Sequence, residues 1–411
     1  MQRILVLGAG FAGLWSAVGA ARKLDELGVD PGEVEVLVVN RTPWHSIRVR
    51  NYEANLKGTR VPLADVLGPI GVKLVVAKVT DIDIPGRKVT CEIGGALQAL
   101  AYDRLVFALG SCLAEPAIPG LETHAFNVDT FEAATRLNDH IGSLPSRPVS
   151  TSQYNVLVVG GGLTGIEVAT EMFSKLRAAI AHAPASGLAT PPRVILADHQ
   201  AWIGSDMGES ARPVIAEALQ NLGVETRPGI SVASIDARGA TLATGALIPA
   251  ATVIWCAGMQ ADPLTARFPV ARDRLGRLPI DANLKIKGMP VEFAAGDVAW
   301  LPIDGTHASV MSCQHARPMG RFAGYNVVGD LLSQPMLPLN IDWYVTCLDL
   351  GPWGAVYTQG WDRQVAAKGA AAKRTKEIIN CQRIYPPRSR NRREILDAAA
   401  PVVQTPPDQL H

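Results

Sequence analysis

The sequence lacks an uninterrupted apolar run of about 18 residues, which is the length that a membrane-spanning helix needs. There is no room for a signal peptide, because an apolar segment typical of a β-strand begins within a few residues of Met1. Cysteine is scarce, and no two cysteines have Cys-x-x-Cys spacing or form a close pair. The six are Cys91, Cys112, Cys256, Cys313, Cys347 and Cys381. We therefore predict no metal site and expect a cytoplasmic protein with reduced thiols.

Net charge is also small, but it is unevenly distributed along the chain. The 411 residues, 48% hydrophobic and 19% charged, are typical of a globular protein of two or three domains with net charge +1. Residues 363–393 contain ten Lys or Arg and one acid, Glu377, so this segment carries +9 and the rest of the chain −8. Two interpretations stay open: the segment docks on an anionic membrane surface, or it is a solvated, partly disordered tail. No nucleic-acid partner is expected.

The chain opens with a short apolar strand, a glycine-rich turn and a helix-compatible segment. The strand is "ILVL", the turn "GAGFAG" has G-x-G-x-x-G spacing, and "LWSAVGAARKLDEL" follows. Glycines at these places let the backbone approach a pyrophosphate, whose charge then lies at a helix N-terminus. The next strand, "VEVLVVN", ends where a residue that holds the ribose of a dinucleotide is expected. The predicted contacts are Gly8, Gly10, Gly13, Asn40 and Arg41.

A second unit of the same kind begins at Asn155. The strand "NVLVV" runs into the turn "GGGLTG", which opens the helix "IEVATEMFSKLRAAI", and the returning strand "RVILAD" ends at Asp198. A carboxylate there accepts hydrogen bonds from the free 2′-hydroxyl of NADH and repels the 2′-phosphate of NADPH. Two such units predict two dinucleotides. The second is predicted to be NADH, held by Gly160, Gly162, Gly165 and Asp198.

A third stretch, "VEFAAGDVAW", places Gly296 and Asp297 at the end of a short buried strand. It resembles the motif by which two-dinucleotide flavoprotein reductases bind the ribityl chain and the flavin-side phosphate of FAD. The stretches "YDRLVFALGS" and "ATVIWCAGMQADPL", with Gly110 and Gly258, resemble the strands that leave each nucleotide domain in that superfamily. FAD is then expected in the first unit and NADH in the second.

The resemblance implies an α/β fold with two Rossmann-like dinucleotide-binding domains, the second inserted in the first, and a C-terminal region. The implied FAD-binding domain comprises residues 1–115 and 270–330, and the NAD(H)-binding domain residues 145–265. The basic C-terminal region, residues 335–411, is a candidate for contact with the inner face of a membrane or for homodimer formation.

Within that superfamily the chain resembles type II NADH dehydrogenases, which pass electrons from NADH through FAD to a quinone. Disulfide reductases instead carry a Cys-x4-Cys or Cys-x2-Cys pair beside the flavin, and this chain has neither. In "GGGLTGIEVATE", Glu167 falls on the family's glutamate beside the nicotinamide. In "SCQHARPMG", Gln314 and Ala316 match the family's A-Q-x-A-x-Q quinone motif, and "KEIINCQRIYPPR" resembles its stretch before membrane attachment. The resemblance implies catalytic roles for Glu167 and Gln314.

The chain departs from the family where the acceptor binds. Cys313 stands for the first alanine of the quinone motif and Pro318 for its second glutamine. The loop "NRTPWHSIRVRNYE" is charged, where the family usually has an apolar, aromatic segment. Alternation in "SIRVR" predicts that both arginines lie on one face of a strand. The predicted acceptor-binding residues are Gln314, His315, Arg48 and Arg50. The acceptor is expected to be a quinone or a more polar small molecule.

Two other functions stay open. A sulfide:quinone oxidoreductase also uses FAD and a quinone, but it needs cysteines that flank the flavin, and only Cys313 and Cys347 could serve. A non-enzymatic flavin-bound sensor would be reduced by NADH and reoxidise slowly with every quinone. Structural roles also stay open: Glu167 as a partner of the helix dipole, Gln314 as an ordinary helix residue and His315 as a hydrogen-bonded structural histidine.

Overall fold

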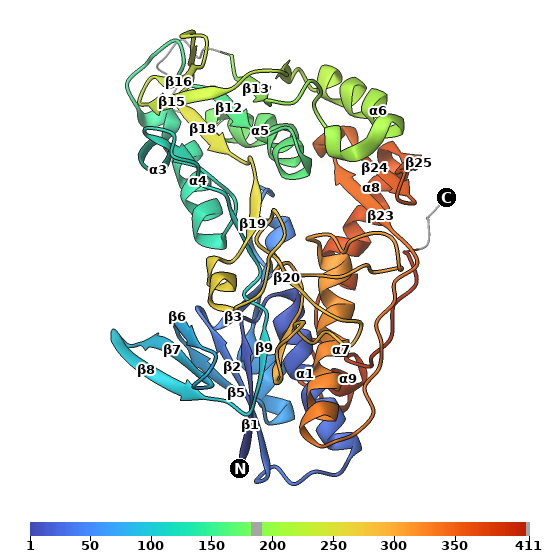
Figure 1. The fold of residues 1–411 in the computed structure, drawn as a ribbon. Helices are drawn as coiled ribbons and strands as arrows, with labels where there is room; N and C mark the ends of the chain where they lie inside the picture. The colour runs from blue at the N-terminus through green and yellow to red at the C-terminus, as the bar shows by residue number, and fades with distance from the viewer. Residues whose placement is uncertain (182–190, 408–411) are drawn as a thin grey trace.

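Two parallel sheets in opposite halves of the molecule form the core of the computed structural model, which describes residues 1–181 and 191–407 (Figure 1). The first sheet has the strand order β21-β9-β1-β2-β5, and all neighbouring strands run parallel. Its strands are β1 (Gln2–Leu7), β2 (Val34–Asn40), β5 (Lys73–Val76), β9 (Arg104–Phe107) and β21 (Glu292–Ala294). The central strands are buried apolar runs, as expected for a parallel sheet that is covered on both faces.

Helices α1 (Phe11–Glu26) and α7 (Cys313–Leu331) pack side by side against this sheet (Figure 1). Glycines on α7 permit the close approach, because a Cβ at Gly320 would overlap the carbonyl oxygen of Ala12 and one at Gly324 that of Ser16. Ala316 lies beside Gly296, which in turn contacts Ala12. The packing therefore brings the N-terminus of α7 to the first glycine turn.

Smaller elements extend the first half of the molecule. An antiparallel sheet of β6 (Lys78–Asp83), β7 (Lys88–Ile93) and β8 (Ala96–Ala101) projects from one side of it. The short elements are β3 (Trp44–Ser46), β4 (Arg60–Pro62), α2 (Leu63–Leu67), β20 (Leu278–Pro279) and β22 (Ala299–Trp300).

The second parallel sheet has the order β11-β18-β12-β13-β14. Its strands are β11 (Ala125–Phe126), β12 (Asn155–Val159), β13 (Arg193–Ala197), β14 (Glu225–Arg227) and β18 (Thr252–Trp255). The accompanying helices are α3 (Leu121–His124), α4 (Phe131–Ser143), α5 (Leu163–Ala181) and α6 (Gly208–Asn221). A small antiparallel sheet consists of β15 (Val232–Asp236), β16 (Gly239–Leu242) and β17 (Leu247–Pro249).

The chain leaves the first half through β10 (Ser111–Leu113) and returns through β19 (Met259–Ala261), and these two strands pair antiparallel. The chain segment that forms the second sheet is thus inserted between the segments that form the first sheet, and the predicted fold class is confirmed. The domain boundaries proposed from the sequence stay predictions, and β11 and α4 fall between them.

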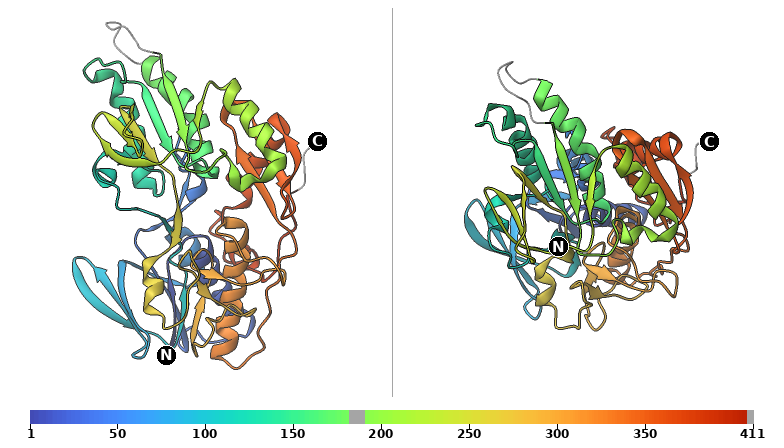
Figure 2. Two further views of the ribbon diagram at one scale, coloured as in Figure 1. Left: turned by 45° about the horizontal axis from the view of Figure 1, so that its top comes forward. Right: turned by 90° about the horizontal axis from the view of Figure 1, so that it is seen from above.

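The C-terminal region is folded, including the segment that the sequence analysis considered as a possible disordered tail. The antiparallel strands β23 (Val345–Asp349), β24 (Ala355–Gln359) and β25 (Gln364–Lys368) form a sheet beside α6 (Figure 2). The chain continues through α8 (Gly369–Ile378), a π-helical turn (Ile379–Arg383) and α9 (Arg392–Asp397), which packs on α1. The interpretation of residues 363–393 as a solvated tail is therefore wrong.

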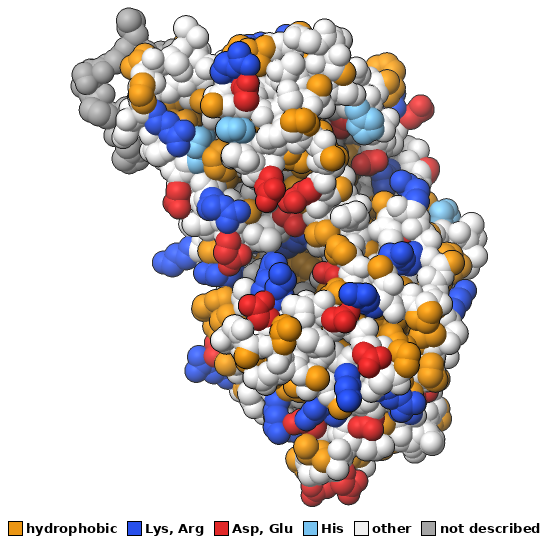
Figure 3. Space-filling model, turned by 60° about the vertical axis from the view of Figure 1, so that its left-hand side comes forward, with side chains coloured by type: hydrophobic (Ala, Val, Ile, Leu, Met, Phe, Trp, Pro, Cys, Tyr) orange, Lys and Arg blue, Asp and Glu red, His pale blue; other side chains and the backbone are white. Residues whose placement is uncertain are grey.

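Most of the charge of this basic segment is neutralised within the fold. Six of its ten cations form ion pairs with carboxylates. The pairs are Lys368–Glu217, Lys373–Asp349, Lys376–Glu167, Arg390–Asp65, Arg392–Asp25 and Arg393–Asp397. On the face drawn in Figure 3, acidic and basic side chains are interspersed. Among the described residues, no helix is both long and apolar enough to cross a bilayer.

Candidate functional site

The first glycine turn combines tight backbone packing with one open position. Gly8 has φ +90°, and a Cβ on it would lie 2.5 Å from the carbonyl oxygen of Ala108. A Cβ at Gly13 would overlap the carbonyl oxygen of Gly8. A Cβ at Gly10 would meet nothing within 4 Å, so the backbone there is accessible to a ligand. This geometry fits a pyrophosphate at the N-terminus of α1.

Asn40, at the end of β2, is hydrogen-bonded to the first glycine turn and to the loop that follows β2. Its Oδ1 accepts a hydrogen bond from the Ala9 amide at 2.9 Å, and its Nδ2 donates to the carbonyl of Thr42 at 2.7 Å. Arg41, the next residue, is exposed. An amide is suited to this position because it can accept from the turn and donate to the loop that follows.

The Gly296–Asp297 motif lies beside the first turn, because β21 pairs with β9, which in turn pairs with β1. Asp297 Oδ2 accepts a hydrogen bond from Ser111 Oγ at 2.6 Å, and burial raises the pKa of this carboxyl. Gly296 has φ +79° and leaves no space for a side chain, because its Cβ would lie 2.7 Å from Ala12 Cβ. A carboxylate at this place can accept hydrogen bonds from sugar hydroxyls, as the ribityl chain of FAD requires.

The connecting strands carry the two other predicted glycines. Gly110 precedes β10 with φ +79° and has no atom within 4 Å of its Cβ position. Gly258 precedes β19 with φ +80°, and a Cβ on it would lie 3.1 Å from Ala114 Cβ. Both have left-handed backbone conformations that favour glycine, at the points where the chain passes between the two halves.

The second glycine turn repeats the first. Gly160 has φ +112° and its Cβ would lie 2.8 Å from the Ala257 amide nitrogen, while a Cβ at Gly165 would overlap the carbonyl oxygen of Gly160. Gly162 is less confined, since the nearest atom to its Cβ position is Asp206 Oδ2 at 3.5 Å. This turn also fits a pyrophosphate at the start of a helix, here α5.

Asp198 lies at the end of β13, against the second turn. Its Oδ2 accepts a hydrogen bond from the Gly161 amide and its Oδ1 accepts one from the Gln200 amide at 2.7 Å. Arg227, on the neighbouring strand, is committed to Glu225. The carboxylate is therefore held beside the second turn, and its role in discriminating between a ribose hydroxyl and a phosphate stays a prediction.

A buried ion pair joins the second nucleotide unit to the C-terminal region. Glu167 Oε1, on α5, accepts from Lys376 Nζ at 2.7 Å and from the Asp349 amide at 3.1 Å. Lys376 also donates to the carbonyl of Cys347 at 2.8 Å. Glu167 and Lys376 are 7% and 8% exposed. Sequence reasoning missed Lys376 as a site residue, although it is the first residue of the stretch "KEIINCQRIYPPR" that carries part of the family resemblance.

The electrostatics of this pair follow from its burial. Removal from water raises the pKa of Glu167, and the nearby ammonium opposes that rise. Burial alone would lower the pKa of Lys376, but attraction to Glu167 raises it. Asp349, at the end of β23, is held in turn by Tyr52 at 2.9 Å and Lys373 at 2.6 Å. The cluster is thus a compact set of charges enclosed by α5, α8 and β23.

Gln314 meets the same strand at its other end. The Gln314 Oε1 accepts a hydrogen bond from the Val345 amide at 3.4 Å, while Glu167 contacts the amide of Asp349. The Gln314 Nε2 is buried and has no hydrogen-bond partner among the described residues. The structure therefore brings the two predicted catalytic residues to opposite ends of β23 and leaves one amide donor free.

The predicted acceptor residues are not gathered in one place. Arg48 and Arg50 lie on a 3-10 turn, so the prediction that they share one face of a strand is wrong. Arg48 donates to Ser111 and pairs with Asp129, and Arg50 donates to Glu53 at 2.7 Å and to a tyrosine of the C-terminal region. The backbone turns here because the Arg50 amide donates to the carbonyl of Ile47 and the Asn51 amide to that of Arg48, three residues earlier in each case.

His315 is enclosed by aromatic side chains. Its Nδ1 accepts from the Val310 amide at 3.0 Å, it is 0% exposed, and burial lowers its pKa to about 4. Its ring lies 6.0 Å from that of Tyr344 and 6.1 Å from that of Trp361. A role in acceptor binding stays a prediction, and the surroundings are those of a neutral structural histidine.

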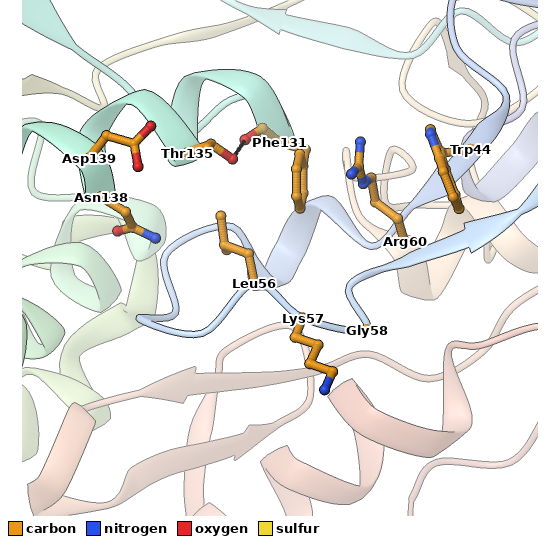
Figure 4. A pocket seen from close by; sticks show the side chains of 9 residues that line it. All are labelled: Trp44, Leu56, Lys57, Gly58, Arg60, Phe131, Thr135, Asn138 and Asp139. Atoms are coloured by element: carbon orange, nitrogen blue, oxygen red, sulfur yellow. Dashed lines mark hydrogen bonds between the residues drawn. The ribbon is translucent and has the colours of Figure 1, made fainter.

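Two open cavities lie away from these residues. One of about 470 Å³ lies between the 44–60 loop and α4, and there the guanidinium of Arg60 lies between the rings of Trp44 and Phe131, 4.9 and 3.5 Å from their centroids (Figure 4). The other, of about 540 Å³, is lined by residues 113–127 and Trp255. Neither cavity is lined by the glycine turns, Glu167 or Gln314.

Comparison with known proteins places these features in a family. The model of the pyridine nucleotide-disulphide oxidoreductase family matches residues 2–320. An NADH dehydrogenase-like protein of Mycobacterium tuberculosis (strain CDC 1551 / Oshkosh) is 55% identical over 407 residues, which cover 99% of this chain and 100% of that protein. The type II NADH:quinone oxidoreductase Ndh of M. tuberculosis (strain H37Rv) is 30% identical over 331 residues, 72% of this chain and 67% of that protein.

Among solved structures, NDH2 of Plasmodium falciparum in complex with NADH has the same fold. The TM-score is 0.76 at 13% sequence identity, with 97% of each chain covered. Both parallel sheets and the C-terminal region therefore have counterparts in that protein.

Proposed function

Because the chain belongs to the pyridine nucleotide-disulphide oxidoreductase family, we propose that it oxidises NADH and passes the electrons through FAD to a quinone-like acceptor. The chain is an NADH-dependent oxidoreductase, its cofactors are FAD and NADH, and the resemblance to type II NADH dehydrogenases stated from the sequence is confirmed. The prediction of an enzyme is thus confirmed over the non-enzymatic sensor. What we propose beyond this is that the electron acceptor is quinone-like.

We assign FAD to the first glycine turn and NADH to the second. Gly10 leaves the backbone open at the start of α1, and Asp297 offers a carboxylate to sugar hydroxyls beside it. Asp198 supplies the carboxylate for the ribose of NADH. FAD, when bound, supplies the two-electron chemistry, and the protein residues position and enclose the reactants.

One observation carries the choice of a quinone-like acceptor: the buried Gln314 Nε2 has no hydrogen-bond partner among the described residues. A buried amide N–H without an acceptor is unfavourable by about 1–3 kcal/mol, so such groups are normally paired. A quinone carbonyl oxygen is an acceptor that would satisfy this donor. Gln314 lies at the N-terminus of α7, which the helix packing brings to the first glycine turn, the proposed FAD site.

The reaction also requires a proton. Oxidation of NADH by a quinone consumes one proton from solution for each quinol formed, because the hydride carries two electrons and only one proton. Lys376 bears exchangeable protons and donates one hydrogen bond to Glu167. Glu167 lies four residues after Leu163, the first residue of α5 in the second nucleotide unit. We propose that this pair keeps the region polar and charged while excluding bulk water.

The sulfide:quinone oxidoreductase alternative is not favoured by the cysteines. Burial raises the pKa of Cys347 to about 12, and its thiol donates to the carbonyl of Ala372 at 3.8 Å. Burial also raises the pKa of Cys313. Sulfide chemistry uses thiolates as nucleophiles, and both groups are held as thiols at neutral pH.

Membrane docking through residues 363–393 is not part of the proposal. Among the described residues, four cations of that segment lack a carboxylate partner, and two of them, Arg363 and Arg388, lie over tyrosine rings. At about 1 kcal/mol for each cation near an anionic surface, the attraction is much smaller than the ten charges in the sequence suggest.

The test is steady-state turnover of NADH with soluble quinones, ferricyanide, sulfide and oxygen, for the wild type and for Gln314→Leu. We expect turnover with a quinone, and a drop of about tenfold in kcat/KM for the quinone in the variant, because one hydrogen bond to the acceptor is lost. Ferricyanide serves as the control acceptor, since it takes electrons without a carbonyl contact, and its rate should be unchanged. No turnover with any quinone, or equal losses with both acceptors, would contradict the proposal.

A further inference from the structure

A group of buried arginines lies between α1, α7 and the C-terminal segment, one to two helical turns from the N-terminus of α7. Arg317 and Arg321 are one turn apart on α7 and are 6% and 3% exposed. Both guanidinium groups lie over the ring of Trp15 on α1, at 5.6 and 4.5 Å from its centroid. Arg383, from the π-helical turn, is the third cation of the group and acts electrostatically on both. Two positive side chains thus contact one indole, and a third lies within electrostatic range of both.

The described part of the chain offers these cations almost no hydrogen-bond acceptor. Arg317 donates once, from Nη1 to Gln404 Oε1 at 3.1 Å, and Arg383 donates to the carbonyl oxygen of Thr405. Within residues 1–181 and 191–407, the side chain of Arg321 makes no hydrogen bond or ion pair. The Nε atoms of Arg317 and Arg321 and the Nε1 of Trp15 are all buried without an acceptor. Three buried donors on neighbouring side chains are therefore without acceptors among the described residues.

Among the described residues, two other buried cations are paired with carboxylates, and a third, Lys175, donates to Asn138 Oδ1 at 2.9 Å. Lys376 has Glu167, and Arg277 has Asp273 at 2.8 Å together with the carbonyl of Ser309 at 2.5 Å. In the arginine group the described residues supply neutral acceptors only. Burial and mutual repulsion lower the pKa of Arg317 to about 10 and that of Arg321 to about 9. Contact with an indole attracts a cation, but it leaves the N–H groups of the guanidinium without acceptors.

We propose that Arg317, Arg321 and Arg383, with the indole N–H of Trp15, form a binding site for a small oxyanion, a phosphate or a carboxylate group. The guanidinium fork donates two parallel hydrogen bonds to either group, and an anion would cancel the repulsion among the three cations. Gln404 and Thr405 lie at the edge of the site and would close it around the ligand. Trp15 lies five residues beyond Gly10 on α1, about 7.5 Å along the axis, so the site is separate from the glycine turn.

The experiment uses the full-length protein with FAD bound, dialysed into chloride buffer, and inorganic phosphate as the probe. The thermal midpoint is followed by circular dichroism during a phosphate titration, with potassium chloride of equal ionic strength as the reference. We expect the wild-type midpoint to rise and saturate with phosphate, because a ligand that binds only the folded state stabilises it. Chloride should produce no such saturation.

Two variants of Arg321 and one surface control separate the site from general salt effects. Arg321→Met keeps the volume and removes the uncompensated charge, so we expect a midpoint at or above that of the wild type without phosphate, and no response to phosphate. Arg321→Lys keeps a charge but not the fork, and should bind phosphate at least about tenfold more weakly. Arg272→Met removes a charge from an exposed position and should keep the full response.

Three results would overturn the proposal. The first is a wild-type midpoint that phosphate does not raise above the chloride reference. The second is a phosphate response that survives in Arg321→Met, which would place the anion elsewhere. The third is loss of flavin from Arg321→Met, measured by absorbance after gel filtration, which would assign the arginines to FAD.

Discussion

Replacement of Lys376 by Met tests the buried ion pair at the centre of the proposed site. The ammonium lies 2.7 Å from Glu167 Oε1, and the two side chains are 10% and 9% exposed. Met fills the space of the aliphatic part of the lysine side chain, so the main effect is electrostatic. Glu167 would keep the hydrogen bond from the Asp349 amide but lose its counter-ion. Loss of one partner of a buried pair destabilises a protein by about 3–5 kcal/mol.

The expected change in the thermal midpoint follows from the size of the chain. An unfolding entropy of about 2.1 cal/mol/K per residue makes 1 kcal/mol equivalent to roughly 1.2 °C if all 411 residues unfold together. Lys376→Met should therefore lower the midpoint by about 4–6 °C at pH 7, measured with FAD in excess. Lys368→Met is the matched control, because Lys368 lies 3.7 Å from Glu217 and both side chains are more than half exposed. It should change the midpoint by about 1 °C or less.

Acidification should reduce the deficit of Lys376→Met. Burial raises the pKa of Glu167, and removal of the ammonium takes away the attraction that opposes this rise. A carboxyl with a raised pKa destabilises the fold while it is ionised and stops doing so when pH falls through its pKa. The difference between wild type and variant should then shrink from pH 7 to pH 5, and Glu167→Gln in the same chain should abolish it. An equal loss in Lys376→Met and Lys368→Met would refute the argument.

Two further predictions concern cofactor choice and acid stability. Asp198→Ser should raise the ratio of kcat/KM for NADPH to that for NADH by about tenfold, because it removes the charge that repels a 2′-phosphate; an unchanged ratio would mean that Asp198 does not face the ribose. His45 is 0% exposed, its Nδ1 lies 2.8 Å from the carbonyl oxygen of Ala9, and burial lowers its pKa to about 4 from 6.5. Its contribution to stability is complete above pH 6.5 and is lost as pH falls to 4, by about 3 kcal/mol. Unfolding of the wild type and His45→Gln across that range should show the steeper loss in the wild type, and parallel curves would contradict this.

The sequence by itself predicted the features that depend on neighbouring residues. A glycine turn between a strand and a helix is a local backbone arrangement, and the φ values of Gly8 and Gly160 belong to the region that favours glycine. In each unit an apolar strand precedes the turn and another follows the helix. These patterns were sufficient to predict the fold class, since parallel strands with connecting helices have few alternative topologies. The motif at Asp297 added a further indication of FAD in the first unit. Its proximity to the first turn, however, depends on the pairing of β21 with β9.

Only the tertiary structure decided which distant residues meet. Lys376 and Glu167 are 209 residues apart, and although a motif indicates Glu167, nothing in the sequence pairs it with Lys376 until α5 and α8 pack on β23. The basic segment 363–393 has the composition of a solvated tail, yet its pairing with acids from elsewhere in the chain makes it part of the fold. Arg317 and Arg321 are likewise ordinary helix residues in the sequence. Composition and periodicity report the average surroundings of a residue, whereas its burial and its partners are set by contacts between elements that the chain order does not specify.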